Sequence, residues 1–557
     1  MTVATASTTL LLPSPPAHRP FHQLDRRYGR RRAALQCRAG WQEGSESSDW
    51  RHRTAAAAAA ALLTVQGLAL PAASFAAASP VPLVAADLQQ QQAAALGQQT
   101  PDTLALPPLP SSFPPLAPLA LPKYKQLTLS NGLRVFLLED HELPVVRGSI
   151  LMRGGQRASP DEKVGLATLS AAVQRSGGSL QHPGQQLDDE LEERAASIEG
   201  GAGPEAFGFG FQCLTEDTPD VMQLFAEVVR EPALPQDKLE LARQQVLSAL
   251  EHRNDNPSAI PGREVAKLIY GKGSVFARDP TPEQIQSITV EDMRQFLQRW
   301  ERPDSAVLGI VGDFQPAQMQ RLVEECFGSW APPPGQPSPP PLPNPPLADQ
   351  GPISGRIFLV DVPGAQQAAV AAGEPGIRLM DRDEYSLQVL DRLFNGFGGR
   401  LFNQIRSREG LAYSVSGGWT ATPIDHPGLF IATAETAQPA ALLAAVRGAL
   451  DDAVAEPPSA AELQRAKQES VESFVFNFAS RPAQLYRALT FDLLGIPQDY
   501  LFRYKSGIEH VTAADVQAAA QRRLHPSQQT IVVAGDAARL RPELERLGLP
   551  IEDLPLS

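Results

Sequence analysis

Residues Ile288–Asp313 read ITVEDMRQFLQRWERPDSAVLGIVGD, and residues Val511–Asp536 read VTAADVQAAAQRRLHPSQQTIVVAGD. The two stretches align without a gap. Each opens with a Thr followed three residues later by an Asp, which is typical of a capped helix start. Each closes with an apolar run before Gly-Asp, which is typical of a buried strand. One helix–strand unit therefore occurs twice, and this repeat predicts two domains that are homologous to each other.

Identical residues at matching positions support this alignment. They are the pairs Thr289/Thr512, Asp292/Asp515, Gln298/Gln521, Arg299/Arg522, Pro303/Pro526, Gly312/Gly535 and Asp313/Asp536. Further upstream, the residues Leu239, Ala242 and Gln244 recur at nearly the same separation as Leu463, Ala466 and Gln468. We therefore expect an α+β fold built from two homologous αβ domains of about 200 residues each.

A proline-rich segment separates the two copies. Residues 331–349 begin with APPPGQPSPPPLPNPP, a composition that favours an extended, semi-rigid linker. This division predicts an N-terminal domain over 123–330, a C-terminal domain over 350–545 and a tail over 546–557.

Hydrophobic periodicity predicts the main elements of the first domain. We expect strands at 133–138, 145–152, 207–211 and 306–311, and helices at 165–173, 220–230, 236–253 and 290–300.

Composition excludes several classes of protein. The chain has 557 residues, of which 43% are apolar and 20% charged, and these values fit a globular protein of more than one domain. Residues 1–53 contain 9 Arg and 4 acidic residues, which leaves 40 basic and 58 acidic residues in the remainder. This acidic balance argues against nucleic acid as a partner. The cysteines Cys37, Cys213 and Cys326 form no CxxC pattern, so a disulfide framework or a cysteine metal site is not indicated.

The N-terminus has the composition of targeting sequence. Residues 1–53 are rich in Ser, Ala, Pro and Arg, which predicts a plastid transit peptide. Residues 54–80 form an apolar run that ends in small residues, which predicts a second signal of the kind that directs proteins to the thylakoid lumen. The alternatives for 54–78 are an uncleaved membrane anchor, which would place the protein at the thylakoid membrane, and plain low-complexity alanine. Residues 81–122 are rich in Gln, Ala and Pro, and we expect them to be a disordered linker.

A second informative stretch, NGFGGRLFNQIRSREGLAYSVSGGW, spans Asn395–Trp419. Its glycines at Gly396, Gly398 and Gly399 predict a loop that no regular element tolerates well. A short helix should follow and end at Gly410 in the left-handed conformation, because glycine is the usual residue at that position. Alternating residues from Leu411 onward predict a strand.

This block resembles the C-terminal domain signature of the pitrilysin/insulinase family of zinc peptidases, which includes the mitochondrial processing peptidases. In that family an Arg and a Tyr at this spacing bind the substrate backbone near the scissile bond, and here they fall on Arg406 and Tyr413. A guanidinium and a phenol held at one helix-to-strand turn can both donate hydrogen bonds to one peptide carbonyl. The resemblance also implies that Gly396, Gly398 and Gly399 let a peptide backbone approach closely.

The resemblance covers roughly residues 122–545, which is nearly the whole region expected to fold. It implies two domains of the LuxS/processing-peptidase type that face each other as a clamshell around a chamber. The zinc motif of the family, H-x-x-E-H, is absent: after Gly165 its two His positions fall on Thr168 and Ala172, and its Glu position on Ala171. The position of the third zinc ligand falls on Ala249. Because these four residues do not ligate metal, we expect this chain to bind no zinc and to have no catalytic residue of its own.

In this family, chains without zinc commonly pair with a homologous chain that holds it. We therefore expect the non-catalytic, substrate-positioning subunit of a heterodimeric zinc metallopeptidase that cleaves peptides or presequences in the plastid, with zinc in the partner subunit. The main alternative is a structural subunit of a membrane complex derived from a processing peptidase. A peptide-binding protein that acts alone, or a hydrolase without zinc, are further alternatives.

Overall fold

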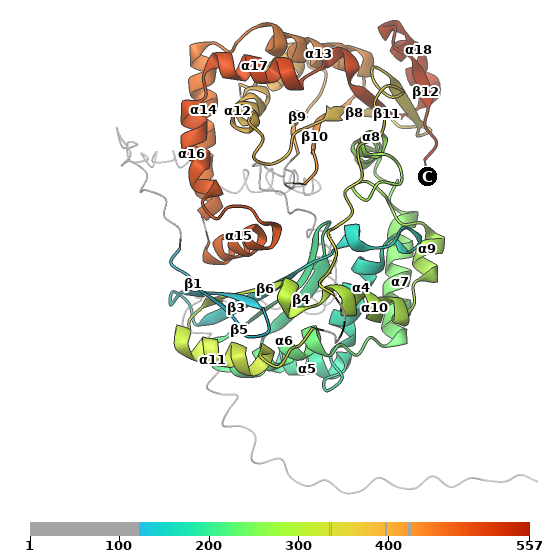
Figure 1. Cartoon of the computed structure of the whole chain (residues 1–557). Helices are drawn as coiled ribbons and strands as arrows, with labels where there is room; N and C mark the ends of the chain where they lie inside the picture. The colour runs from blue at the N-terminus through green and yellow to red at the C-terminus, as the bar shows by residue number, and fades with distance from the viewer. Residues whose placement is uncertain are drawn as a thin grey trace, which may run out of the picture. The chain divides into compact units, whose positions relative to one another are not determined.

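Two six-stranded mixed sheets organise the computed structural model (Figure 1). The structure describes residues 122–332, 335, 337–395, 398–420, 425–478 and 480–556. The transit peptide and the second signal expected over 1–80 lie outside the described residues, as does nearly all of the linker expected over 81–122.

The N-terminal half contains the first sheet, in the order β1-β2-β6-β3-β5-β4. Its strands are β1 (Lys125–Thr128), β2 (Arg134–Glu139), β3 (Val145–Arg153), β4 (Ser197–Ala202), β5 (Ala206–Leu214) and β6 (Ala306–Gly312). The helices of this half are α4 (Leu166–Gly177), α5 (Gly184–Glu193), α6 (Thr218–Arg230), α7 (Gln236–Glu251), α8 (Ile260–Tyr270), α9 (Pro282–Ser287), α10 (Val290–Trp300) and α11 (Pro316–Phe327). All eight elements expected for this half are confirmed, with ends that differ by a few residues.

The C-terminal half contains the second sheet, in the order β12-β7-β11-β8-β10-β9. Its strands are β7 (Ile357–Asp361), β8 (Ala368–Pro375), β9 (Val415–Trp419), β10 (Leu429–Thr436), β11 (Thr530–Gly535) and β12 (Ile551–Asp553). Its helices are α12 (Glu384–Phe394), η6 (Phe402–Arg408, a π-helix), α13 (Pro439–Ala455), α14 (Ala460–Phe474), α15 (Arg481–Leu494), α16 (Tyr500–His510), α17 (Ala513–Arg523) and α18 (Ala537–Leu544). Between α11 and β7, the described residues contain no helix or strand.

The predicted repeat is confirmed in three dimensions. Helices α10 and α17 both start with a reciprocal capping box, in which the Thr hydroxyl accepts from the Asp backbone N–H at 3.2 Å, in Thr289/Asp292 and in Thr512/Asp515 alike. The strands that follow, β6 and β11, hold the same place in their sheets. Each pairs in parallel with one neighbour, β2 or β7, and antiparallel with the other, β3 or β8.

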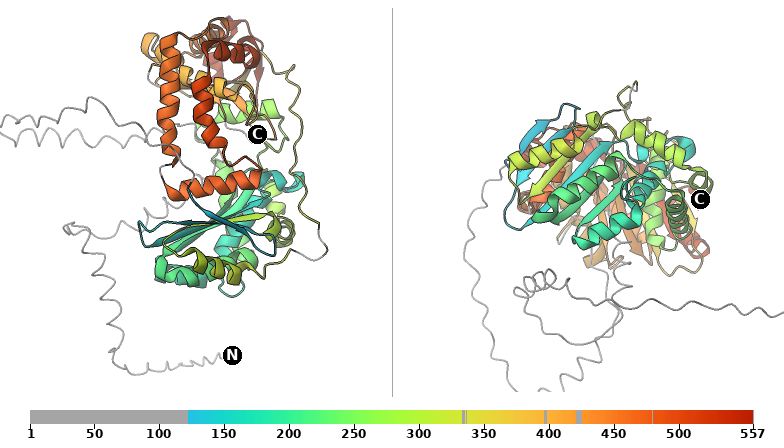
Figure 2. Two further views of the ribbon diagram at one scale, coloured as in Figure 1. Left: turned by 60° about the vertical axis from the view of Figure 1, so that its left-hand side comes forward. Right: turned by 90° about the horizontal axis from the view of Figure 1, so that it is seen from below.

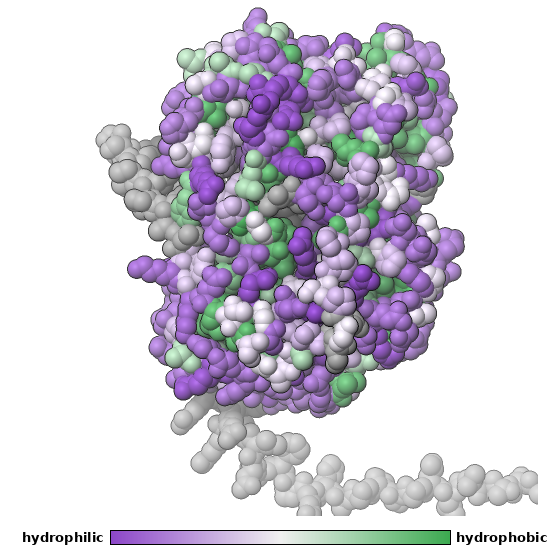
Figure 3. Space-filling view, in the orientation of Figure 1, coloured by the Kyte–Doolittle hydropathy of each residue, from purple (hydrophilic) through white to green (hydrophobic). Residues whose placement is uncertain are grey.

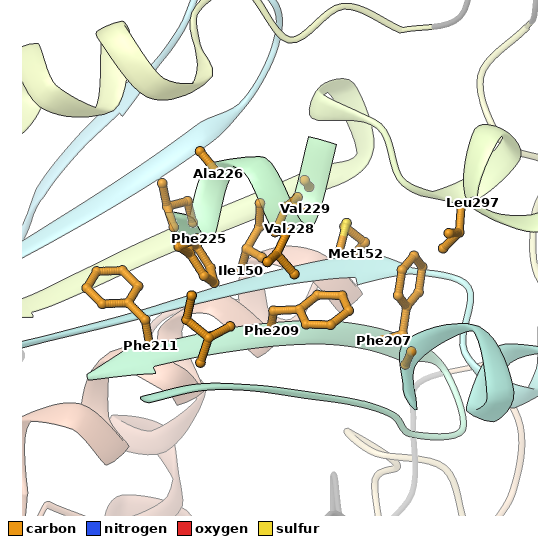
Figure 4. Close-up of a cluster of buried hydrophobic side chains, with 14 of the residues drawn as sticks. Ile150, Met152, Phe207, Phe209, Phe211, Phe225, Ala226, Val228, Val229 and Leu297 are labelled. Carbon is orange, nitrogen blue, oxygen red and sulfur yellow. The ribbon is translucent and has the colours of Figure 1, made fainter. Parts of the chain in front are cut away.

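The hydrophobic core of the N-terminal half lies between its sheet and the helices on one face. Strand β5 alternates glycine with Phe207, Phe209 and Phe211, so the three aromatic rings lie on the same side of the sheet. They pack with Ile150 of β3 and with α6 (Figure 4). Phe225 of α6 lies 5.0 Å from Phe211, measured between ring centres.

On the opposite face, each sheet receives a helix from the other half of the chain (Figure 2). Helix α15 places Leu485, Leu489 and Leu493 against β6, β3 and β2 of the first sheet. Helix α8 packs Val265 and its neighbours against β8 and β11 of the second sheet. This exchange of α8 and α15 between the halves holds the two halves together. The hydrophobic periodicity of each helix does not indicate which sheet the helix covers.

Two expectations for the C-terminal half are corrected by the structure. Residues 546–557 are not simply a tail, because β12 pairs in parallel with β7 at the edge of the sheet. The strand expected from Leu411 starts only at Val415, because the Leu411 N–H donates to the Ile405 carbonyl at 2.8 Å and keeps the chain in the preceding turn.

Hydrophilic side chains cover most of the face seen in Figure 3, and apolar side chains form small groups among them. In the part of the chain that the structure describes, no helix has the length and hydropathy needed to cross a bilayer.

Candidate functional site

The Arg406 and Tyr413 pair lies on the turn between η6 and β9. Leu401 and Ile405 are four residues apart, a spacing typical of one helix face, and both are fully buried on the inner side. Gly410 adopts the left-handed conformation, with φ of 63°, and the prediction of a glycine cap is confirmed. The wide turns of η6 and this cap leave Arg406 and Tyr413 on the outer side.

Arg406 is held between two aromatic rings. Its guanidinium carbon lies 4.6 Å from the centre of the Tyr413 ring and 5.0 Å from the centre of the Phe402 ring. Such contacts are favourable because the ring face is electron-rich, and an exposed one contributes about 0.5–1 kcal/mol. Tyr413 is 81% exposed. The rings therefore fix a guanidinium that would otherwise move freely on the surface.

The pair is available to bind another molecule. Within the described residues, neither the Arg406 guanidinium nor the Tyr413 hydroxyl makes a hydrogen bond or an ion pair. The Arg406 guanidinium carries five N–H donors. These donors and the phenol hydroxyl suit a carbonyl, carboxylate or oxyanion acceptor.

Asn395, at the end of α12, ties this turn to the sheet. Its amide donates to the Gly417 carbonyl at 2.8 Å, and its side-chain oxygen accepts from the Gly417 N–H at 3.1 Å. Beneath it lies the carboxyl of Asp391, and burial raises the pKa of this carboxyl to about 6. A side chain on Gly418 would overlap Asp391, and one on Gly417 would lie 2.8 Å from Leu401. The glycines of β9 therefore make room for this support.

The glycine loop before η6 has a packing role in its described part. Gly396 lies outside the described residues. Gly398 has φ of 96°, and its carbonyl accepts from Arg465 of α14 at 3.0 Å. A side chain on Gly399 would overlap the backbone carbonyl of Asn395, so this position requires glycine whether or not a peptide approaches.

Sequence reasoning missed the residues that support the pair, namely Phe402, Asn395, Asp391 and Arg465. A signal existed for Phe402, because it precedes Arg406 by four residues, a spacing that places two side chains on one helix face. The contacts of the other three join elements far apart in the sequence.

The structure places the four positions of the missing zinc motif on α4 and α7. Ala171 is fully buried, Thr168 and Ala172 are partly buried, and Ala249 is exposed near the end of α7. The two helices pack against each other. The side chains at the four positions are methyl groups and one hydroxyl, and these do not fit zinc, which takes nitrogen, sulfur or carboxylate ligands.

No alternative metal centre occurs among the described residues, where no three His, Cys, Asp or Glu side chains converge. The described histidines have protein partners. These pairs are His141 with Asp313 and Glu139, His182 with Glu227, His252 with Asp255, His426 with Asp425, His510 with the Ser506 carbonyl, and His525 with Glu374. Cys213 and Cys326 are buried free thiols.

Two family models match the chain. The model described as insulinase (peptidase family M16) matches residues 134–276, and the model described as peptidase M16 inactive domain matches residues 287–470. Together they cover strands β2 to β10 and the helices α4 and α7.

Characterised sequences and solved structures are similar as well. A non-peptidase homolog, YmxG of Helicobacter pylori, is 27% identical over 286 residues, which cover 50% of this chain and 62% of that protein. The chain thus spans less than two thirds of that relative. Cytochrome b-c1 complex subunit 1 of Bos taurus is 21% identical over 37% of this chain and 44% of its own length.

A crystal structure of a peptidase M16 inactive domain from Pseudomonas fluorescens superposes with a TM-score of 0.65 at 22% identity. The match covers 74% of this chain and 98% of that one. At this level of identity it shows the shared fold and nothing further.

Proposed function

Because the chain belongs to the insulinase family, peptidase family M16, as a homologue that lacks the zinc motif, we propose that it is the substrate-positioning subunit of a heterodimeric zinc peptidase. A homologous partner chain carries H-x-x-E-H and therefore holds the zinc and the general base. The present chain contributes Arg406 and Tyr413. Its substrates are peptides or presequences.

The observation that carries this proposal is the Arg406 guanidinium, stacked between Phe402 and Tyr413 with its donors free. A chain that had lost all contact with substrate would have no need to hold an exposed Arg in one orientation. Charged donors held at a fixed position bind a substrate carbonyl and stabilise negative charge that develops on its oxygen during hydrolysis. Phe402 acts through Arg406 and is a positioning residue.

The compartment of this complex in the proposal is the plastid. The support is the composition of residues 1–53, rich in Arg and nearly free of acids in its first part. The apolar run over 54–80 favours the thylakoid lumen, or the thylakoid membrane if the run is retained.

A second candidate function is that of a structural subunit in a membrane complex. The similarity to a subunit of the cytochrome b-c1 complex favours it. In that case the Arg406 and Tyr413 pair would have no substrate, and its replacement would change nothing but local packing.

The test starts from the tagged full chain, purified from its own organelle with any stoichiometric partner. If the partner carries H-x-x-E-H, the complex is reconstituted with variants of this chain, and hydrolysis of a peptide library is measured. We expect Arg406→Ala to lower kcat/KM at least about tenfold, because loss of one oxyanion donor commonly costs a factor of about 100 or more. Arg408→Ala is the matched control, since it removes an exposed Arg from the same helix.

Two variants of Tyr413 separate its roles. Tyr413→Phe keeps the ring over Arg406 and removes only the hydroxyl donor, whereas Tyr413→Ala removes both. A larger defect for Ala than for Phe indicates that the ring positions Arg406. Turnover that is equal in the wild type, Arg406→Ala and Tyr413→Ala contradicts the proposal, and a partner set made of membrane-complex subunits favours the second candidate.

A further inference from the structure

Several segments of the chain meet around the guanidinium of Arg157, where the two halves are in contact. Arg157 lies in the N-terminal half, in the short helix η1 (Gln156–Ala158), and donates to Asp425 of the C-terminal half at 2.9 Å and 3.3 Å. Its guanidinium carbon is 4.9 Å from the centre of the Phe276 ring, on which His426 stacks at 3.8 Å. Glu205, in the turn between β4 and β5, completes the group. We call these five residues the junction cluster.

The linker between the halves is bound to the same cluster. The Pro343 carbonyl accepts from Arg157 at 2.7 Å, and the Asn344 amide donates to the Asp425 carbonyl at 2.8 Å. The bond between Arg157 and Asp425 therefore joins the N-terminal half, the C-terminal half and the linker at one point. If this bond breaks, all three contacts are weakened together.

Two carboxyl groups of the cluster share the guanidinium unequally. Asp425 accepts two hydrogen bonds from Arg157, whereas the Glu205 carboxyl is 3.6 Å from Nη1, which is too long for a hydrogen bond. The backbone keeps Arg157 beside Glu205 within the N-terminal half, because the Arg157 N–H donates to the Pro204 carbonyl at 3.0 Å. Arg157 can therefore pair with a carboxyl of its own half or with a carboxyl of the other half.

The charges of the cluster decide which carboxyl holds a proton. Burial raises the pKa of Glu205 above its usual range, and the charges of Arg157 and His426 oppose that rise. The charge of Asp425 adds to it. Burial would raise the pKa of Asp425 as well, but hydrogen bonds with His426 and Arg157 hold it well below its usual range. The nearby phenol of Tyr270 has a pKa that burial raises, so it stays neutral. Glu205 is therefore the group that takes up a proton when Arg157 is bound to Asp425.

We propose that proton binding to Glu205 controls the contact between the two halves at the junction cluster. With Glu205 protonated, Arg157 stays bonded to Asp425 and the junction is closed. When Glu205 loses its proton, two carboxylates compete for one guanidinium, and a buried carboxylate without a bonded cation is unfavourable. Opening the junction relieves this, because Arg157 then pairs with Glu205 and Asp425 returns to water.

The direction of the pH effect follows from the two states of Glu205. Its pKa is raised in the closed junction and returns towards its ordinary value when the junction opens, so closing takes up a proton. The closed junction is therefore favoured below the ordinary pKa of a glutamate, and this contribution is lost as the pH rises through the raised pKa. The cluster contains neither Arg406 nor Tyr413, so the proposal does not depend on the proposed peptidase role.

Energy transfer between two dyes on single molecules of the full chain distinguishes open from closed junctions. The dyes are attached at Gln298→Cys of α10 and Ala441→Cys of α13, which are exposed positions in different halves. Cys37→Ser removes a competing thiol, and Cys213 and Cys326 are buried. We expect the ratio of open to closed molecules to rise at least about threefold between pH 4 and pH 8.

Glu205→Gln resembles the protonated carboxyl at every pH, and we expect it to keep the junction closed and to remove this rise. Glu199→Gln is the matched control, because Glu199 lies on the neighbouring strand β4 with 74% of its side chain exposed, and the rise should remain. Asp391 is present in all three proteins and so cannot account for a difference between them. A wild type without the rise, the same rise in Glu205→Gln, or a Glu205→Gln junction that is open at every pH overturns the proposal.

Discussion

Gly309 of β6 lies directly beneath Leu489 of α15, so that a Cβ on the glycine would come within 2.7 Å of the leucine Cδ1. The contact joins the sheet of one half to a helix of the other. Gly373 of β8 holds the same relation to Val265 of α8, at 2.9 Å. Each exchanged helix thus reaches its sheet over a glycine, and a larger residue there would push the helix away.

Gly309→Val should therefore destabilise the protein by overpacking, at a cost of about 1–3 kcal/mol. The free energy of unfolding in urea measures the effect. Gly262→Ala is the control, because this α8 glycine has no neighbour within 4 Å of an added Cβ, and we expect the change to be neutral or stabilising. A Gly309→Val variant as stable as the wild type would mean that α15 does not rest on β6.

Arg157 forms a second connection between the halves and is almost fully buried, with 1% of its surface exposed. Its guanidinium donates to Asp425 at 2.9 Å and to the Pro343 carbonyl of the linker at 2.7 Å. Glu205, also buried, lies 3.6 Å away. Burial raises the pKa of Glu205, and the charge of Arg157 opposes that rise.

Arg157→Met keeps most of the side-chain volume but leaves the buried Glu205 and the partly buried Asp425 without their cation. Breaking a buried ion pair in this way costs about 3–5 kcal/mol. Arg503→Met in the exposed Arg503–Asp499 pair should cost less than about 0.5 kcal/mol. Urea unfolding of both variants gives the comparison, and equal losses of stability would show that Arg157 contributes no more than a surface charge.

The sequence predicts the parts of this fold that depend on local pattern. The two helix starts are predicted by the capping boxes Thr289/Asp292 and Thr512/Asp515, because a capping box is formed within four residues. Gly410 predicts the end of η6, because glycine is the usual residue in the left-handed conformation after a helix. The sequence does not predict that α8 and α15 each pack on the sheet of the other half. Apolar residues such as Val265 and Leu489 could be buried equally well against either sheet.

The candidate site likewise contains residues that the local sequence predicts and residues that it does not. Arg406 and Tyr413 are found by their spacing, and the separation of four residues between Phe402 and Arg406 is a further signal. The wide turns of η6 correspond to no residue pattern in the sequence. Asn395 and Asp391 of the supporting group lie against Gly417 and Gly418 of β9. In the sequence, two adjacent glycines are more typical of a loop than of a strand. The missing metal ligands, in contrast, are evident from residue types alone.

The internal repeat gives a prediction about stability. Thr289→Ala and Thr512→Ala should each lower the free energy of unfolding by about 1 kcal/mol, because each removes the oxygen that caps a helix. Thr289→Ser and Thr512→Ser keep that oxygen and should have little effect. Thermal or urea unfolding of the four variants measures this, and a loss at one position alone would show that the two helix starts are not equivalent in energy.

Asp391 gives a prediction about pH. Burial raises the pKa of its carboxyl from 3.8 to about 6, so the folded protein holds this proton more tightly than the unfolded chain does. The group therefore favours folding below the unfolded pKa, and this contribution is lost as the pH rises through the folded pKa of about 6. Asp391→Asn resembles the protonated carboxyl at every pH. The variant should match the wild type in stability near pH 4 and exceed it above pH 6, by up to about 3 kcal/mol for a shift of this size.

The measurement is the difference in free energy of unfolding between the wild type and Asp391→Asn from pH 4 to pH 8. Other titrating groups are common to both proteins and cancel in that difference. Asp189→Asn on the exposed side of α5 is the control and should give a difference close to zero at each pH. A difference that does not change between pH 4 and pH 8 would mean that the Asp391 carboxyl ionises alike in the folded and unfolded protein, and that the support beneath β9 is open to water.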